Sequence, residues 1–223
     1  MAYTDSNSRI ETTDRRLIMF DWDGVLADSL DVFTTVFLQS CRQCGFHGLR
    51  EPGQLMGLFD ENLYQAMQKL GLDQEMIGQI LNCFKRNVNT HLHEIQLFDG
   101  VASALNTIAR KHTVTIITSN ISEIPLNVLA REGVKSVEQV LGAEVDTSKT
   151  RKIRQTISRY PGSQPFYVGD TKGDMLEGKE AGASTIAVTW GWHSMEKLDE
   201  GKPDYRVSSP RELAVLLGGR ITD

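Results

Sequence analysis

Residues 17–29 read LIMFDWDGVLADS, and the prediction of the fold starts from these residues. Its first four residues form a continuous apolar run, which ends at the acidic and glycine-containing residues 21–24. A short apolar run bounded in this way is typical of a strand that is buried on both faces of a sheet. The stretch therefore predicts a buried strand with Asp21 and Asp23 at its carboxyl end.

Apolar runs of the same kind recur at residues 114–117, 166–168 and 185–188, and polar residues follow them. The helical patterns between and beside these runs cover residues 102–110, 124–131, 150–160 and 174–180. Strands that alternate with helices at this spacing form a parallel sheet with right-handed crossover connections. The sequence therefore predicts the α/β class with a parallel sheet.

One long stretch, residues 30–97, interrupts this alternation because it contains no convincing strand. Apolar residues recur there at helical spacing over residues 32–44, 63–70 and 74–87. The interruption falls directly after the first predicted strand. We therefore expect an α-helical cap over residues 31–97, inserted into the α/β fold.

The insertion divides the chain into parts of different character. The α/β core then comprises residues 17–30 and 98–223, while residues 1–16 are polar, show no periodicity and predict a flexible N-terminal arm. A chain of 223 residues suits one domain, or one domain that carries an insertion. We expect the second of these arrangements.

Charge and hydropathy exclude several classes of partner. The chain has 24 Lys and Arg against 29 Asp and Glu, a net charge of −5 that repels nucleic acid and anionic lipid. The apolar run at residues 17–20 is shorter than a signal-peptide core or a membrane span of about 20 residues. We expect a cytoplasmic protein without a nucleic-acid or membrane partner.

Three cysteines, an odd and low number, argue against a disulfide framework. Cys41 and Cys44 have the spacing of half a zinc site, with His47 nearby as a third ligand. However, the surrounding residues 32–46 form an amphipathic helical pattern, and no second ligand pair follows. We interpret these cysteines as small apolar residues of a helix.

The candidate functional side chains lie at the carboxyl ends of the predicted strands. Ligands of open parallel α/β sheets bind outside the carboxyl ends of the strands. The acids and hydroxyls expected to meet there are Asp21, Asp23, Thr118, Ser119, Asp170 and Asp174. Converging carboxylates repel one another unless a cation lies between them, and hard oxygen ligands favour Mg²⁺. One of the first two acids can then act as an ionised nucleophile and the other as a proton donor.

The sequence gives less support to other roles for these acids when the residues are considered together. An EF-hand calcium loop that began at Asp21 would need glycine at its sixth position, whereas Gly24 falls at the fourth. A single acid at a strand end can also cap a helix or face solvent. No glycines occur at the spacing of a dinucleotide-binding fingerprint.

These motifs resemble those of the haloacid dehalogenase superfamily. The DWDGVLADS stretch is similar to the first family motif, TSN at residues 118–120 to the second, and GDTKGD at residues 169–174 to the fourth. The third family motif is a lysine at a helix start, for which Lys149 matches best and Lys152 is the rival. The resemblance covers residues 17–217, and the TWGW sequence that begins at Thr189 is closest to the phosphoglycolate-phosphatase-like subgroup.

The resemblance implies a Rossmann-like core and a set of catalytic roles. Asp21 would attack phosphorus and form an aspartyl-phosphate. Asp23 would protonate the leaving oxygen and later activate water. Thr118 and Lys149 would hold the phosphoryl oxygens.

The resemblance also implies substrate-binding and metal-binding residues. Ser119 and Asn120 would join Lys149 in binding the substrate. A Mg²⁺ ion would be held by Asp170 and Asp174, together with Asp21 and the backbone carbonyl of Asp23. The expected cofactor is therefore Mg²⁺.

The resulting expectation is a Mg²⁺-dependent phosphatase, a monomer or homodimer, that acts on a small phosphorylated metabolite such as a phosphoglycolate-like phosphomonoester. A sugar phosphomutase of the same fold is the first alternative. A phosphonate hydrolase would need a cap lysine, Lys69 or Lys85, as a Schiff base, and a non-catalytic phosphate-responsive module is the last alternative. Three cap histidines, His47, His91 and His93, are expected at the surface or a hinge rather than on substrate.

Overall fold

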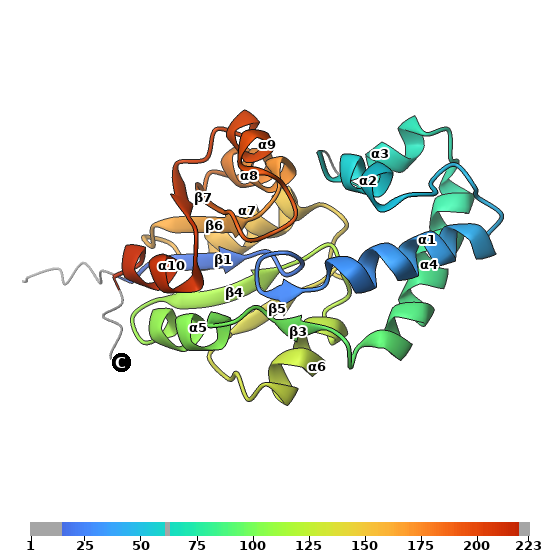
Figure 1. The fold of residues 1–223 in the computed structure, drawn as a ribbon. Coiled ribbons are helices and arrows are strands. Elements are labelled where there is room, and N and C mark those ends of the chain that lie inside the picture. The colour runs from blue at the N-terminus through green and yellow to red at the C-terminus, as the bar shows by residue number, and fades with distance from the viewer. Residues whose placement is uncertain (1–14, 61–62, 219–223) are drawn as a thin grey trace, which may run out of the picture.

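The computed structural model describes residues 15–60 and 63–218, which contain a six-stranded parallel sheet with helices on both faces (Figure 1). In spatial order the strands are β5 (Gln139–Leu141), β4 (Thr113–Ile117), β1 (Leu17–Phe20), β6 (Pro165–Gly169), β7 (Ser184–Val188) and β8 (Tyr205–Val207). All five neighbouring pairs are parallel. The predicted α/β class is confirmed.

Strand β1 is central because both of its faces are covered. Ile18 and Phe20 pack into one apolar cluster, whereas Leu17 and Met19 pack into another. Side chains alternate between the two faces of a strand, so a continuous apolar run buries both. The run at residues 17–20 therefore forms a strand between two helical layers.

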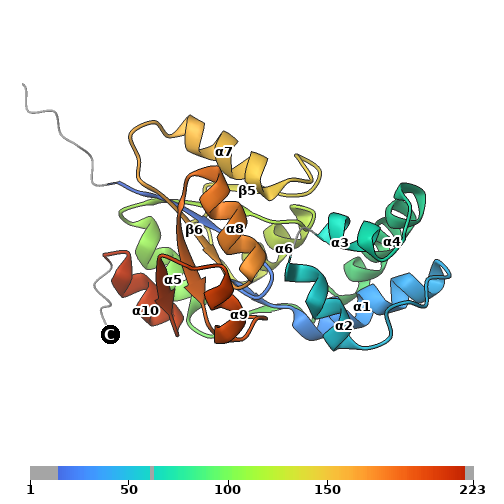
Figure 2. The same cartoon turned by 90° about the horizontal axis from the view of Figure 1, so that it is seen from above.

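The two helical layers are visible on opposite sides of the sheet (Figures 1 and 2). One layer contains α5 (Val101–Ala109), α6 (Glu123–Arg131) and α10 (Pro210–Leu216), and the other contains α7 (Lys149–Arg159), α8 (Lys172–Ala181) and α9 (Met195–Glu200). Helices α7 and α8 pack against each other, as do α5 and α10. None of the helices in residues 15–60 and 63–218 combines the length and apolar character that a membrane crossing requires.

Between β1 and β4 the chain forms a helical segment, defined here as α1 (Leu30–Gln43), α2 (Pro52–Met56), α3 (Leu63–Lys69) and α4 (Gln74–Val88). It lies beyond the carboxyl ends of the central strands (Figure 1). Helices α1 and α4 pack against each other, with Phe37 and Ile80 buried. Asn87 of α4 also donates a hydrogen bond to Ser40 Oγ of α1 at 3.0 Å.

Two short strands join the helical segment to the sheet domain. Strand β2 (Ala27–Asp28) pairs antiparallel with β3 (Gln96–Leu97) where the chain leaves and re-enters the domain. Arg131 of α6 fastens the returning connection by donating to the backbone carbonyls of Leu92 and Ile95. The prediction that residues 30–97 lack a strand is wrong at β3, whose two residues are too few to show a periodicity.

The remaining differences from the expected elements lie at short strands, at helix ends and at the short helices α2, α9 and α10, which were not predicted. Strands β5 and β8 were not predicted, because each has only three residues at an edge of the sheet. Helices α7 and α8 begin one and two residues before their predicted starts. Most of the N-terminal arm expected over residues 1–16 lies outside the described residues.

Candidate active site

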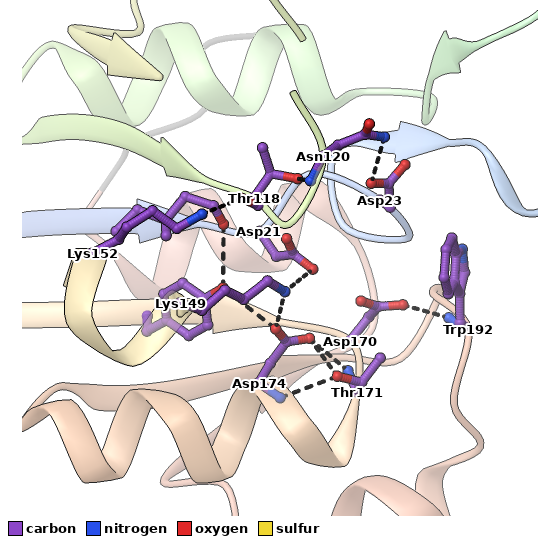
Figure 3. Close-up of polar contacts among 12 residues, drawn as sticks. Asp21, Asp23, Thr118, Asn120, Lys149, Lys152, Asp170, Thr171, Asp174 and Trp192 are labelled. Carbon is purple, nitrogen blue, oxygen red and sulfur yellow. Dashed lines mark hydrogen bonds and ion pairs between the residues drawn. The ribbon is translucent and has the colours of Figure 1, made fainter. Parts of the chain in front are cut away.

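Three buried carboxylates meet at the carboxyl ends of the two central strands (Figure 3). Asp21 directly follows β1, Asp170 directly follows β6, and Asp174 lies in the first turn of α8. One oxygen from each carboxylate lies within 4.8 Å of the others. The ends of the parallel strands therefore bring together residues that are distant in the sequence.

Lys149 supplies the positive charge of this carboxylate cluster. It is the first residue of α7, a helix whose N-cap is Ser148. Lys149 Nζ lies 2.9 Å from Asp21 Oδ2 and 2.8 Å from Asp174 Oδ1. The lysine that faces the carboxylates is therefore Lys149.

The rival lysine, Lys152, has a different position one turn further along α7. Its side chain is fully buried, and Nζ donates to the Thr118 carbonyl at 2.5 Å and to the Gly142 carbonyl at 3.1 Å. Burial, with the nearby Lys149 charge, lowers the pKa of Lys152 to about 8. Lys152 thus joins the loop after β4 to the loop after β5.

The carboxylates are incompletely neutralised by a single ammonium group. Burial, supplemented by Asp174, raises the pKa of Asp21 to about 7 against the opposing effect of Lys149. Burial and the neighbouring Asp174 and Asp21 charges raise the pKa of Asp170 well above its usual range. Burial also acts on Asp174, but the stronger combined effect of Lys149 and Thr171 lowers its pKa. A further positive charge would relieve this repulsion.

Asp170 has one oxygen that the protein does not satisfy. The backbone N–H of Trp192 donates to Asp170 Oδ2 at 2.6 Å, whereas Oδ1 is buried and has no hydrogen-bond partner in the described part of the chain. A Cβ atom on Gly24 would lie 2.0 Å from Asp170 Oδ2, and one on Gly191 would lie 2.3 Å from Asp170 Cβ. Two glycines therefore allow the backbone to approach this carboxylate closely.

Asp23 lies outside the carboxylate cluster. Its oxygens accept hydrogen bonds from Ser29 Oγ at 2.7 Å and from Asn120 Nδ2 at 3.4 Å. Burial raises its pKa, which Ser29 and Asn120 partly counteract. Its side chain is therefore oriented by Ser29 and Asn120, and it is not part of the group formed by Asp21, Asp170 and Asp174.

The predicted phosphate-binding residues after β4 occupy two environments. Thr118 is fully buried, and its Oγ1 accepts the backbone N–H of Asn120 at 2.9 Å. Ser119 and Asn120 line the cavity that contains Asp21 and Lys149, whereas Thr118 is not part of its lining. The side chain of Thr118 therefore supports the loop on which Asn120 lies.

The donor set of this site fits Mg²⁺. It consists of carboxylate oxygens, which are hard ligands, and includes the unsatisfied Oδ1 of Asp170. Asp174 is less available, because its oxygens accept from Lys149 and from the Thr171 hydroxyl and N–H. Asp21 and the unsatisfied Asp170 are therefore the carboxylates with most capacity left for a cation, whereas Asp174 is largely engaged by protein donors.

A cavity of about 310 Å³ opens onto Asp21, Asp174 and Lys149, whereas Asp170 is not part of its lining. Several of its contributors were not predicted from the sequence, namely Thr171, Glu177, Trp192 and the aromatic residues of α1 and α4. The capping box of α8, in which Thr171 and Asp174 exchange hydrogen bonds, is a signal that could have identified Thr171. Glu177 lies one helical turn after Asp174, a spacing that also places it on the same side of α8.

Other candidate ligands lie elsewhere. Cys41, Cys44 and Cys83 are free cysteines of the helical segment. Within residues 15–60 and 63–218, the carboxylate cluster is the only group of three potential metal-binding side chains. The three histidines of residues 31–97 do not line the cavity.

Comparison with known proteins agrees with this arrangement. A family model described as "Haloacid dehalogenase-like hydrolase" matches residues 18–188. A phosphoglycolate phosphatase of Synechococcus elongatus is 29% identical over 203 residues, which is 88% of this chain and 94% of that protein. A 5′-nucleotidase of Pseudomonas aeruginosa is 26% identical, covering 84% of this chain and 89% of that protein. A solved haloacid dehalogenase-like hydrolase from Streptococcus pneumoniae superposes with a TM-score of 0.76 at 22% identity, covering 92% of this chain and 99% of that one.

The close approach of Gly24 to Asp170 generates a stability prediction. Gly24 has φ +75°, where an alanine is strained by about 1–2 kcal/mol, and its added Cβ would also meet Asp170. Gly24→Ala should lower the free energy of unfolding by roughly 1–3 kcal/mol more than the backbone strain alone. Denaturant unfolding measures the loss.

Gly45→Ala is the matched control for this substitution. Gly45 has φ +80°, but apart from its two chain neighbours no described residue comes within 4 Å of the position that a Cβ would take there. The loss in free energy of unfolding for the control should therefore reflect only the backbone strain. Equal losses of stability in the two variants would contradict the proposed steric conflict at Asp170.

Burial of Lys152 predicts a dependence of stability on pH. Above pH 8 Lys152 keeps its proton in the unfolded chain but loses it in the folded chain. The free energy of unfolding of the wild type should therefore rise with pH relative to that of Lys152→Met. The relative gain should be about 1–2 kcal/mol between pH 8 and pH 10, measured by urea unfolding of both proteins.

Lys111→Met is the control, because Lys111 is exposed and also donates to a backbone carbonyl, that of Gly218. An exposed ammonium group carries no burial cost, so the control should follow wild type within about 0.5 kcal/mol. Parallel pH profiles for wild type and Lys152→Met would rule out the expected effect of burial.

Proposed function

Since the chain belongs to the haloacid dehalogenase-like hydrolase family and is a phosphatase, we propose that it hydrolyses a small phosphomonoester through an aspartyl-phosphate, with Mg²⁺ as cofactor. The observation that carries the proposal is the juxtaposition of Asp21, Lys149 and the unsatisfied Asp170 oxygen, with Asp21 and Lys149 on the surface of one cavity. Phosphoglycolate, named for the Synechococcus relative, is one member of this substrate class.

Asp21 is the nucleophile of the proposed reaction. Its carboxylate oxygen forms a bond to phosphorus while the bond between phosphorus and the ester oxygen breaks. Lys149 Nζ, 2.9 Å from Asp21 Oδ2, favours the ionised carboxylate that this attack requires. Because Asp21 follows the buried strand β1, its backbone is held in a fixed position for the attack.

Asp23 moves the proton in both halves of the reaction. It gives a proton to the leaving ester oxygen, and it then accepts one from the water that cleaves the aspartyl-phosphate. The hydrogen bonds from Ser29 and Asn120 orient this carboxyl group away from the cluster. Two acids of one motif thus receive separate environments and separate roles.

The phosphoryl oxygens need positive or hydrogen-bonding partners around them. Lys149 offers its ammonium group, and Ser119 and Asn120 lie on the cavity surface beside it. The hydroxyl of Thr118 accepts a hydrogen bond from the backbone N–H of Asn120, so Thr118 acts by holding Asn120 in position. Phosphoryl transfer depends mainly on such positioning and charge neutralisation.

The metal ligands are assigned on the same geometry. Asp21 and Asp170 would hold Mg²⁺, with the backbone carbonyl of Asp23 as a further ligand and Asp174 oriented by Lys149 and Thr171 beside them. When bound, the cation supplies the positive charge that offsets phosphoryl and carboxylate oxygens.

The helical segment acts as a cap over the cavity in this proposal. Phe33 of α1 and Phe84 of α4 line the same cavity as Asp21 and Asp174. A cap that covers the site excludes bulk water and contacts the organic part of the substrate. The insertion of residues 31–97 between β1 and β4 is consistent with this role.

Asp21→Asn tests the nucleophile. The amide cannot form the phosphoenzyme, so phosphate release from any ester should fall by at least about 10³-fold. Asp199→Asn, which alters an exposed carboxylate paired with Arg206, should retain wild-type turnover. Thermal unfolding checks that both variants fold, and substantial activity of a folded Asp21→Asn protein would refute the proposal.

Asp23→Asn tests the proton donor through the choice of leaving group. Hydrolysis of an alkyl phosphate, whose alkoxide must be protonated, should fall by about 10²- to 10⁴-fold. With p-nitrophenyl phosphate, the leaving group is a weak base and needs no proton donor. The rate constant for phosphorylation of the enzyme, measured from the burst of p-nitrophenol, should therefore fall less than it does with the alkyl phosphate. Equal losses in the two bond-breaking rates would remove Asp23 from this role.

A further inference from the structure

The cavity beside Asp21 has two chemically different kinds of lining. The polar lining includes Asp21, Asp174, Lys149 and the loop after β4. The apolar lining includes an aromatic wall, defined here as Phe33 and Phe37 of α1, Phe84 of α4, and Trp192 of the loop after β7. The organic group of an ester whose phosphate is bound at Asp21 would therefore lie in a cavity that this aromatic wall lines.

The rings of the aromatic wall hold one another in place. The Phe33 ring centroid lies 4.9 Å from that of Phe84 and 5.2 Å from that of Trp192, in tilted arrangements. Phe37 stacks on Phe33 at 5.7 Å and meets Phe84 edge-on at 5.6 Å. Such contacts between rings favour a fixed surface with little conformational freedom to lose on binding.

The aromatic wall joins the two parts of the fold. Phe33, Phe37 and Phe84 belong to the helical segment, whereas Trp192 belongs to the sheet domain. The backbone N–H of Trp192 donates to Asp170 Oδ2, so this part of the wall has a fixed relation to the carboxylate cluster. The distance between a bound phosphate and the rings is thereby constrained.

The charges on the cavity surface disfavour an acidic organic group. Lys149 is engaged by Asp21 and Asp174, which leaves Lys85 as the other cationic side chain among the described lining residues. Lys85 is exposed, and two carboxylates, Glu144 and Glu177, line the same cavity. A carboxylate on the substrate would thus meet apolar rings and two acidic side chains, Glu144 and Glu177, the second with a pKa that burial raises to about 7.

We propose that the organic group of the substrate is uncharged, flat and apolar, and that it packs on the aromatic wall. This inference rests on the proposed function and narrows it to phosphomonoesters of aromatic or arylalkyl alcohols. Phe33 and Phe84 determine the specificity, because they contact each other and line the cavity from two different helices. Hydrolysis releases the alcohol and inorganic phosphate, with one water consumed.

Three alkyl phosphates provide the direct test. Benzyl phosphate, ethyl phosphate and phosphoglycolate have alkoxide-type leaving groups, so they differ chiefly in the group that faces the wall. In the presence of Mg²⁺, kcat/KM for benzyl phosphate should exceed that for each of the other two by at least about tenfold. Phosphate release measured over a range of substrate concentrations gives these values.

Two leucine variants assign the preference to the wall. Phe84→Leu keeps an apolar side chain but removes the ring, and it should reduce the ratio of benzyl to ethyl kcat/KM by roughly threefold to tenfold, mainly through KM for benzyl phosphate. Phe46→Leu alters a partly buried phenylalanine of the helical segment that does not line the cavity, and it should preserve the ratio. Phe46 thus controls for a general loosening of residues 31–97.

Lys85→Met tests recognition of a carboxylate. The variant should retain the wild-type order of the three substrates if the rings determine specificity. A wild-type preference for phosphoglycolate that Lys85→Met abolishes would overturn the inference in favour of an acidic substrate.

The outcomes separate this inference from the proposed function. Equal kcat/KM for the three esters, with activity abolished by Asp21→Asn, would overturn the aromatic specificity and leave the phosphatase mechanism intact. A preference for benzyl phosphate that Phe84→Leu leaves unchanged would also overturn it. If the folded wild-type protein with Mg²⁺ releases phosphate from none of the three, both the inference and the proposed function fail.

Discussion

The buried ammonium group of Lys149 is the interaction on which the site depends. It lies within 3 Å of both Asp21 and Asp174, so one cation joins the end of β1 to the first turn of α8. Separating a buried ion pair by removing one partner costs several kcal/mol, because the remaining charge has no solvent to stabilise it. The start of α7 must therefore lie opposite two strand ends, and the parallel sheet makes that arrangement possible.

Lys149 leaves the site with an excess of negative charge, and this excess is concentrated at Asp170. Its Oδ2 accepts from the Trp192 N–H, but its Oδ1 is buried without a donor in the described part of the chain. Gly24 and Gly191 bring backbone against this carboxylate where any larger residue would clash. The fold thus maintains a local conflict of charge that a divalent cation would resolve, at the position where a phosphate ester would also need positive charge.

The sequence was sufficient for the parts of the fold that are buried on both sides, and insufficient for the short or exposed ones. Continuous apolar runs predicted β1, β4, β6 and β7, whereas β5 and β8 have three residues each at the sheet edges. The positions of Asp21 and Asp170 directly after apolar runs correctly predicted that they lie together. The same pattern could not choose between Lys149 and Lys152, because both lie near the start of α7 and only packing shows which one faces the carboxylates.

The aromatic wall lay beyond sequence reasoning for a related physical reason. Phe33 and Phe84 have the spacing of ordinary buried residues in amphipathic helices, and their meeting at 4.9 Å depends on how α1 crosses α4. Catalytic groups at the ends of parallel strands are placed by backbone hydrogen bonds, which a local pattern can reveal. Groups that would recognise the organic part of a substrate are placed by side-chain packing between helices, and a local sequence pattern cannot reveal that packing. The helical segment can therefore change its lining residues, and with them the preferred ester, without disturbing the strand ends that hold Asp21 and Asp170.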